Sequence, residues 1–242
     1  MTSLAGQTAV ITGGTRGIGL AVARGLGSAG AAVVLVGTDE HRARQRASEL
    51  SKEGISATGF GCDVSDAAAV DQLAHAVSQP IDVLVCSAAI MSQRASKTLA
   101  TSAQHWREVM SINLDGVFHV VQAFAPGMAA RRQGRIITLS ACLGRFTGPG
   151  TSGGLAPYRV SKAAVNALTK NLAAELGNGR RGVLVDAVCP GHCATDMGGE
   201  DAPRTAEQGA DTVVWLATRS QLVDGQPVAT GLLWEDRRIV AW

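Results

Sequence analysis

Short apolar runs alternate along the chain with longer stretches in which apolar residues recur at helical spacing. Several of the short runs are hydrophobic at almost every position, as strands buried on both faces of a parallel sheet must be. The runs predicted to be strands are residues 8–12, 32–36, 57–62, 81–86, 134–140, 183–189 and 228–234. The stretches predicted to be helices are residues 17–29, 39–53, 66–78, 103–131, 157–177 and 204–217.

This alternation of strands and helices is typical of the α/β class. We predict a single domain over residues 1–242, built on a doubly wound, mainly parallel sheet of about seven strands with helices on both faces. Three irregular segments each follow a predicted strand, at residues 89–101, 142–156 and 191–203. Open parallel sheets bind ligands outside the carboxyl ends of their strands, so these segments predict where the site lies.

Composition and charge narrow the function classes. Hydrophobic residues make up 46% of the chain, which excludes a disordered protein. The net charge is +2 and basic residues occur in pairs rather than in longer runs, so no nucleic-acid partner is expected. The apolar stretch at residues 8–11 is only as long as a strand and lacks the basic leader of an export signal. We therefore expect neither a membrane partner nor secretion.

The cysteines predict a reducing compartment. There are five, an odd number, and most lie inside apolar runs, so buried thiols in a cytoplasmic protein are expected. Cys189 and Cys193 lie four positions apart but have no second ligand pair nearby. No metal site is predicted.

A glycine-rich segment joins the first predicted strand to the first predicted helix. Glycines let the backbone turn tightly and approach a pyrophosphate, while the helix N-terminus offers free N–H groups. An ordinary structural turn is the alternative, but the position directly after the first strand favours a phosphate site. The residues expected there are Gly13, Thr15, Arg16, Gly17, Ile18 and Gly19.

The end of the second predicted strand indicates which dinucleotide to expect. An NAD site usually has an acidic side chain there, whereas this chain has Thr38, with Asp39 just beyond. Arg16 suits a 2′-phosphate through its fork of donors, which favours NADP(H). The alternative is that Arg16 is a solvated loop cation.

After the third predicted strand, Asp63 and Val64 suit the adenine end of such a cofactor. A carboxylate at this position can accept from the adenine amino group. The alternative is that Asp63 caps the helix that begins near Asp66.

Tyr158 and Lys162 lie four residues apart on a predicted helix, and therefore on one face of it. Free tyrosine loses its proton near about pH 10. A neighbouring ammonium favours the phenolate, so we expect the Tyr158 hydroxyl to exchange a proton near neutral pH. Tyr158 is the only tyrosine of the chain and lies close to an irregular segment, which favours a catalytic pair over an amphipathic surface pair.

The order of these features closely resembles the short-chain dehydrogenase/reductase superfamily, over nearly the whole chain. The features are Thr12-Gly13-x-x-x-Gly17-x-Gly19, Asp63-Val64, Asn113, Tyr158 with Lys162, and Pro190-Gly191. Residues 188–204 are similar to the carbonyl-reductase-like branch. The resemblance implies a Rossmann-type fold and hydride transfer between NADP(H) and a carbonyl or alcohol carbon.

The resemblance also implies residue roles. Tyr158 would be the general acid in reduction and the base in oxidation, and Lys162 would hold the nicotinamide ribose. Asn113 would anchor a water that relays protons from Lys162. Thr195 would bond the carboxamide, and Pro190-Gly191 would shape the floor beneath the nicotinamide ring.

The chain departs from the family pattern after the fourth predicted strand. The family usually has Asn-Asn-Ala-Gly, and this chain has Cys86-Ser87-Ala88-Ala89. Both amides and the glycine are missing. Ser87 and Ala88 are nevertheless expected to line the adenosine side of the cleft.

A second departure concerns the serine that orients the substrate carbonyl in the family. In the conventional register Ala141 occupies its position, and Ser140 points to the other face because strand side chains alternate. A bulge would bring Ser140 round, and a hydroxyl from Thr147, Thr151 or Ser152 is the alternative. Ser140 is kept as a candidate site residue.

The sequence therefore predicts an NADP(H)-dependent carbonyl reductase or alcohol dehydrogenase acting on a small carbonyl or alcohol compound. The missing serine motivates an alternative, in which Tyr158 performs non-redox proton chemistry as in an isomerase, cyclase or dehydratase. The resemblance leaves the oligomeric state open: relatives often form a homodimer or homotetramer through the helices at residues 103–131 and 157–177, and the alternative is a monomer, as in some carbonyl reductases.

Overall fold

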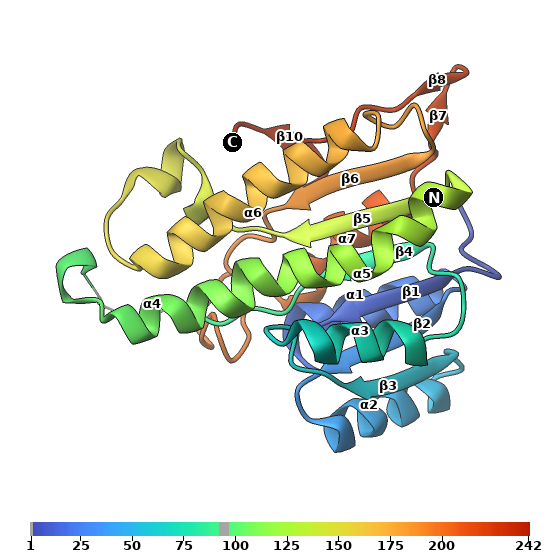
Figure 1. Cartoon of the computed structure of the whole chain (residues 1–242), viewed down its shortest axis with the longest axis horizontal. Coiled ribbons are helices and arrows are strands. Elements are labelled where there is room, and N and C mark those ends of the chain that lie inside the picture. Colours follow the sequence, from blue (N-terminus) through green and yellow to red (C-terminus); the bar gives the residue numbers. More distant parts are fainter. Residues whose placement is uncertain (1, 92–96) are drawn as a thin grey trace.

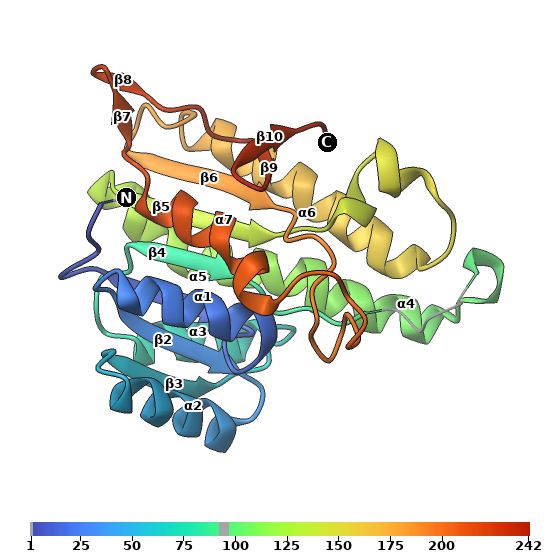
Figure 2. The same ribbon diagram turned by 180° about the vertical axis from the view of Figure 1, so that it is seen from behind.

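An eight-stranded sheet runs through the centre of the molecule, and helices pack on both of its faces (Figures 1 and 2). The computed structural model describes residues 2–91 and 97–242. The strands of the sheet are β1 (Thr8–Thr12), β2 (Ala32–Gly37), β3 (Ala57–Gly61), β4 (Val83–Cys86), β5 (Gly134–Leu139), β6 (Val183–Val188), β9 (Leu233–Glu235) and β10 (Arg238–Val240). Their order is β10-β9-β6-β5-β4-β1-β2-β3, and every neighbouring pair is parallel except β9 with β10. A separate antiparallel pair consists of β7 (Leu222–Val223) and β8 (Gln226–Pro227).

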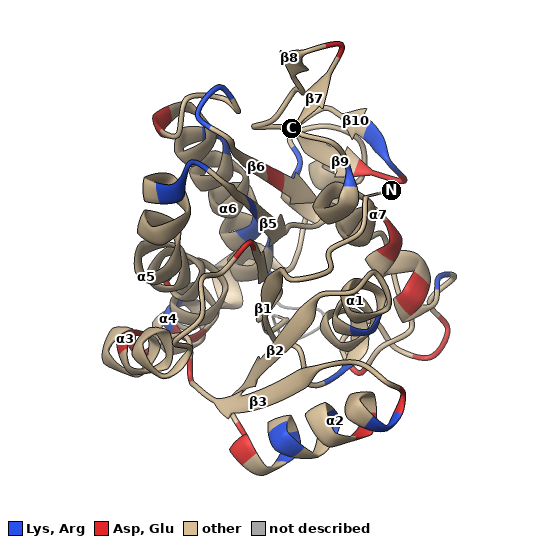
Figure 3. Ribbon diagram, turned by 90° about the vertical axis from the view of Figure 1, so that its right-hand side faces the viewer, with Lys and Arg blue, Asp and Glu red and all other residues tan. Residues whose placement is uncertain are grey.

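The helices form two layers, one on each face of the sheet. They are α1 (Gly17–Ser28), α2 (Glu40–Lys52), α3 (Ala67–Ala76), α4 (Ala103–Met110), α5 (Gly116–Arg131), α6 (Ala156–Glu175) and α7 (Ala206–Thr218). Figure 3 shows α3, α5 and α6 on one side of the strands and α1 and α7 on the other. The described helices include none that combines the length and the apolar character needed to cross a membrane.

Each helix layer covers its own apolar core. Neighbouring residues of β1 supply the two cores because side chains alternate along a strand. Ile11 belongs to the core under α1, α2 and α7, with Leu26 of α1. Val10 belongs to the core under α3, α5 and α6, with Met128 of α5 and Val165 of α6. These side chains are fully buried, and each contributes about 1.5–3 kcal/mol by leaving water.

The predicted fold class is confirmed, and the first six predicted strands end within two residues of the observed ones. The last prediction, residues 228–234, was wrong in extent, since β9 begins at Leu233. Gly231 interrupts the run with a φ of 74°. The Val185 N–H of β6 donates to the Thr230 hydroxyl at 2.7 Å instead of to a backbone carbonyl oxygen of a neighbouring strand.

The sheet also gains β10, which was not predicted. Its two-residue turn consists of Asp236 and Arg237, with φ of 49° and 59°. Such turns are usually built from Asn-Gly or Asp-Gly, so this hairpin carries no sequence signal. The predicted helix at residues 103–131 is interrupted by a π-helical turn, Ser111–Asp115, that joins α4 to α5.

Candidate active site

A cleft of about 520 Å³ opens at the carboxyl ends of the parallel strands. This is where the irregular segments predicted a site. Sixteen of the predicted site residues line it: Gly13, Thr15, Arg16, Gly17, Ile18, Gly19, Thr38, Asp63, Val64, Ser87, Ala88, Ser140, Tyr158, Lys162, Pro190 and Thr195. Two others, Asn113 and Gly191, do not line the cleft but contact or adjoin residues that do.

The turn between β1 and α1 has the geometry of a phosphate site. Gly17 has a φ of 52°, and a Cβ on Gly19 would lie 2.2 Å from the Gly13 carbonyl oxygen, so the turn requires both glycines. Arg16 at the N-cap makes no side-chain cap hydrogen bond, and the first turn of α1 carries no acidic residue. The first N–H groups and the positive end of the helix dipole are thus left for an anion. These residues fit the pyrophosphate of a dinucleotide.

After the end of β2, the Asp39 carboxylate caps the N-terminus of α2. Its Oδ1 accepts from the Arg42 N–H at 3.0 Å, and this hydrogen bond holds the pKa of Asp39 below its usual range. Arg42 itself lines the cleft beside Thr38. The sequence reasoning missed Arg42. A cation in the first turn of a helix is unfavourable because it opposes the helix dipole. The position of Arg42 in the first turn of α2 was therefore a sequence signal for a role in anion binding.

Arg16 spans the mouth of the cleft. Its guanidinium pairs with Asp196 at 2.7 Å, although both side chains are largely exposed, at 62% and 75%. Asp196 follows β6 and lines the cleft, so this ion pair joins the glycine turn to the opposite wall. Arg16 is therefore an exposed cleft residue that pairs with Asp196, and its role toward a 2′-phosphate stays a prediction.

The adenosine end is supported by turns at two strand ends. Asp63 Oδ1 accepts from the Ser65 N–H at 2.9 Å. The alternative in which Asp63 caps the next helix is wrong, because the Asp66 side chain caps α3. At β4, the Ser87 and Ala88 N–H groups donate to Thr12 Oγ1 at 3.1 and 3.3 Å. Thr12 thus holds the segment that lacks the family's two asparagines.

Tyr158 and Lys162 lie on successive turns of α6 and are both buried. The Lys162 Nζ atom lies 5.7 Å from the centre of the Tyr158 ring. The same ammonium donates to the Leu139 carbonyl oxygen at 2.7 Å, at the end of β5. The predicted pair therefore exists, and its position is set by both α6 and β5.

The electrostatics of the pair differ from the sequence prediction. Burial, together with the charges of Cys142 and Cys189, raises the pKa of Tyr158 instead of lowering it. Burial also lowers the pKa of Lys162 to about 8. Desolvation disfavours the charged form of each group, and it is the largest cause of both pKa shifts. Tyr158 keeps its proton at neutral pH, which suits a general acid.

Ser140 reaches the cleft without a bulge. Its N–H donates to the Val188 carbonyl oxygen at 2.8 Å and so continues the β5–β6 ladder by one residue. Thr138, two positions earlier, bonds Thr169 of α6, and Ser140 follows on the same face of the strand because side chains alternate. Ser140 lines the cleft, and its catalytic role stays a prediction. Its Oγ is buried without a hydrogen-bond partner, an orphan donor that fits a ligand oxygen.

Other candidate hydroxyls lie elsewhere in the described part of the chain. None of the alternatives Thr147, Thr151 and Ser152 lines the cleft, and neither does Ala141 at the family's usual serine position. Thr151 and Ser152 donate within their own loop, to Gly148 and Pro149 carbonyl oxygens at 2.8 and 3.0 Å. Of these candidates, Ser140 is the one that lines the cleft.

Asn113 lies in the π-helical turn and is fully buried. Its Oδ1 accepts from the Ile90 N–H at 2.8 Å, while its Nδ2 donates to the Ile90 carbonyl oxygen and to Ser161 Oγ. Ile90 lines the cleft. The side chain therefore holds a cleft wall, and the water relay stays a prediction.

The opposite wall follows β6. Pro190 and Thr195 both line the cleft, as predicted. Thr195 Oγ1 accepts from the Gly198 N–H at 3.1 Å, which fixes the rotamer of its side chain. Gly191 has a φ of 74°, a conformation that favours glycine.

Comparison with known proteins decides the family. A family model described as short chain dehydrogenase matches residues 7–206. The chain belongs to the short-chain dehydrogenase family.

Known members of the family resemble this chain over most of its length. It is 37% identical to a gluconate 5-dehydrogenase of Gluconobacter oxydans over 198 residues, which cover 81% of this chain and 74% of that protein. A gluconate 5-dehydrogenase from Burkholderia cenocepacia, in complex with NADP and tartrate, matches with a TM-score of 0.83 and 30% identity, covering 96% and 94% of the two chains. A 3-oxoacyl-(acyl-carrier protein) reductase from Brucella melitensis with bound NAD matches with a TM-score of 0.84 and 27% identity, covering 97% and 90%.

This short-chain dehydrogenase is thus an oxidoreductase that transfers a hydride with a nicotinamide cofactor, as the sequence predicted. The non-redox alternative finds no support in these relatives, which are dehydrogenases and reductases.

Proposed function

We propose that this short-chain dehydrogenase is an NADP(H)-dependent carbonyl reductase that interconverts a ketone and its secondary alcohol. The supporting observation is that Tyr158, Lys162 and Ser140 line the same cleft as the phosphate-binding turn, and that the buried Ser140 hydroxyl has no partner within the described chain. A proton donor and an orphan hydrogen-bond donor thus share one space with the dinucleotide site.

The chain's own residues supply the proton and the orientation, and bound NADPH supplies the hydride. The Tyr158 hydroxyl, protonated at neutral pH, gives its proton to the substrate oxygen as the carbonyl is reduced. The Ser140 hydroxyl donates a hydrogen bond to the same oxygen and stabilises the developing charge. The Lys162 ammonium, held by Leu139, adds positive charge beside the Tyr158 oxygen as it loses its proton.

The cleft favours an uncharged substrate. Around the catalytic pair its lining includes Ile90, Leu139 and Met197, which are apolar. Lys162, the cation of the catalytic pair, is already bonded to the Leu139 carbonyl oxygen. A neutral or weakly polar ketone suits this end of the cleft better than a polyanion.

The proposed activity is tested by incubating the protein with NADPH and a panel of ketones while following the absorbance of the reduced cofactor. We expect consumption of NADPH that depends on the ketone, with the secondary alcohol as product. NADPH binding without consumption across neutral ketones would contradict the proposal.

NADPH is expected to bind more tightly than NADH because Arg16 and Arg42 line the cleft while the Asp39 carboxylate is used as a helix cap. Arg16→Ala should weaken NADPH binding by about 1.5–3 kcal/mol and leave NADH little changed, since a charge-assisted hydrogen bond is lost. Titration calorimetry with both cofactors measures this difference. The control is Asp196→Asn, which frees Arg16 from its ion pair and should keep or tighten NADPH binding. Equal wild-type affinity for the two cofactors would refute this assignment.

Ketone reduction is expected to fall as the pH rises through about 8, where Lys162 loses its charge. The charged form is present below that pKa, and the raised pKa of Tyr158 keeps its proton on over the same range. The rate should therefore be level below pH 8 and decline above it. A kcat profile against pH checks this, with Lys162→Met as control: its rate should be lower and lack the decline. A decline of the same shape in Lys162→Met would assign it to another group.

We further propose a cytoplasmic homo-oligomer. All five cysteines are free thiols, which suits a reducing compartment. Trp106 of α4, Phe118 of α5 and Val160 of α6 are 36%, 47% and 43% exposed on the helices predicted to pair. Light scattering of the purified protein tests the oligomeric state.

A further inference from the structure

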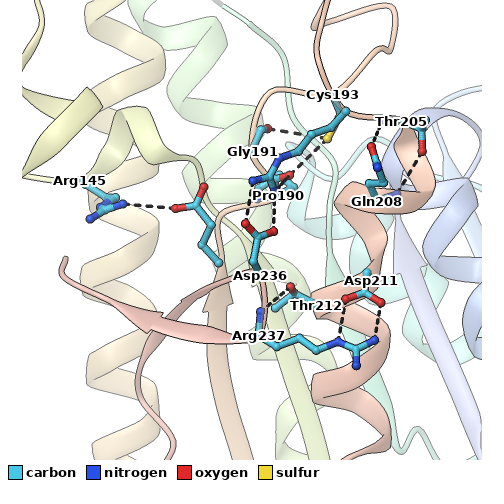
Figure 4. A network of polar contacts seen from close by, with 12 residues as sticks. Arg145, Pro190, Gly191, Cys193, Thr205, Gln208, Asp211, Thr212, Asp236 and Arg237 are labelled. Atoms are coloured by element: carbon cyan, nitrogen blue, oxygen red, sulfur yellow. Dashed lines mark hydrogen bonds and ion pairs between the residues drawn. The ribbon is translucent and has the colours of Figure 1, made fainter.

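On the side away from the cleft, an ion-pair network supports Pro190-Gly191 (Figure 4). The Arg204 guanidinium makes a bidentate pair with Asp236, at 2.7 and 2.8 Å. Its Nη1 also donates to the Pro190 carbonyl oxygen at 3.4 Å. The Arg204 side chain is 28% exposed and that of Asp236 is 59% exposed, so the guanidinium is the more shielded partner. One guanidinium thus joins the segment after β6 to the β9–β10 turn.

The backbone of Arg204 is bonded to the same segment. Its carbonyl oxygen accepts from the Ala194 N–H at 2.7 Å, and its own N–H donates to the His192 carbonyl oxygen at 3.3 Å. The side chain lies against Gly191, where a Cβ would come within 2.7 Å of the guanidinium carbon. Pro190 and Ala194 line the cleft, and Arg204, among the described residues, does not. Arg204 therefore supports this wall from behind.

The turn that presents Asp236 is strained and doubly held. Asp236 and Arg237 are both in the left-handed region, with φ of 49° and 59°, which is unfavourable for side chains other than glycine. Arg237 Nε donates to Asp211 of α7 at 2.8 Å, and the Arg237 N–H donates to Thr212 Oγ1 at 3.1 Å. Strain of this kind persists where the surroundings over-determine the backbone. Of these two contacts, the Thr212 bond is made to the backbone of the turn that presents Asp236, whereas the Asp211 pair engages only the Arg237 side chain.

We propose that Arg204 and Asp236 form a positioning clamp that holds the Pro190-Gly191 wall in place for the nicotinamide half of the cofactor. The inference rests on the proposed function, because that half must lie beside Pro190 and Tyr158 for hydride transfer. The clamp touches neither cofactor nor substrate. It acts through the backbone that it supports, so its loss should spare the adenosine half of the cleft.

The test compares two ligands, NADP⁺ and 2′,5′-ADP, which has the phosphorylated adenosine half and no nicotinamide. Asp236→Asn and Arg204→Gln remove the clamp. Asp211→Asn is the matched control, since the same substitution breaks an ion pair on the same turn that does not contact Pro190-Gly191. We expect the two clamp variants to weaken NADP⁺ binding and lower kcat by about five- to tenfold, because small misplacements are costly in catalysis. Their affinity for 2′,5′-ADP should stay within about twofold of wild type.

Asp211→Asn should leave the ratio of the two affinities at the wild-type value. If Arg204→Gln fails to fold, Asp236→Asn against Asp211→Asn decides alone. The clamp is overturned if Asp236→Asn leaves the ratio unchanged, or if Asp211→Asn changes it equally. Wild-type protein that binds neither ligand would instead overturn the proposed cofactor, and the clamp with it.

Discussion

Tyr158→Phe is expected to lower kcat for ketone reduction by roughly 10²–10⁴-fold, the usual contribution of general acid catalysis. The substitution removes one hydroxyl from a buried ring and leaves the ring packed in α6. The fold and the affinity for NADPH should therefore survive. Single-turnover reduction by protein already loaded with NADPH measures the chemical step directly.

The matched control is Phe124→Leu, a substitution of a buried aromatic residue in α5, away from the cleft lining. It should cost stability but change kcat little. A Tyr158→Phe variant that keeps wild-type kcat would remove the proposed mechanism altogether, whatever the other residues do.

Ser140→Ala is expected to lower kcat by tens to hundreds of fold, as for a removed oxyanion donor. Its buried hydroxyl has no partner within the described chain, so the folded protein loses no internal hydrogen bond. Stability should stay level or rise, because a buried unsatisfied polar group is removed. Thermal unfolding measured beside kcat therefore separates a catalytic loss from unfolding.

Two variants locate the hydroxyl that matters. Thr151→Ala removes a loop hydroxyl that bonds its own loop and should leave kcat within a few fold. The double variant Ser140→Ala with Ala141→Ser moves the hydroxyl to the family's usual position and should not restore activity. Full restoration by this double variant would show that the conventional register holds and that Ser140 is misassigned.

Much of the fold could be predicted because its signals are local. The strands at the centre of the sheet are apolar runs such as residues 8–12, and each is followed by a stretch of helical period. The glycine turn at Gly17 and Gly19 is equally local, since it depends on backbone conformations that these residues alone adopt freely. The pairing of Tyr158 with Lys162 follows from helix geometry.

The direction of the Tyr158 pKa shift could not be predicted, because it depends on desolvation. Spacing along α6 places Lys162 near Tyr158, but the burial that raises the pKa of Tyr158 comes from other elements packed around it. Arg42 was missed for a related reason. Its place in the cleft depends on how the start of α2 meets the end of β2.

The sequence by itself determined the α/β class, the position of the cleft at the carboxyl ends of the strands, and the glycine turn, because each depends on residues that are neighbours along the chain. Only the tertiary structure decided that Ser140 lines the cleft together with Tyr158, since the face of β5 that meets α6 is set by packing. It alone also joined Arg204 to Asp236, which are 32 positions apart. An ion pair between distant segments has no periodicity and no turn signal, and it exists only once the chain has folded.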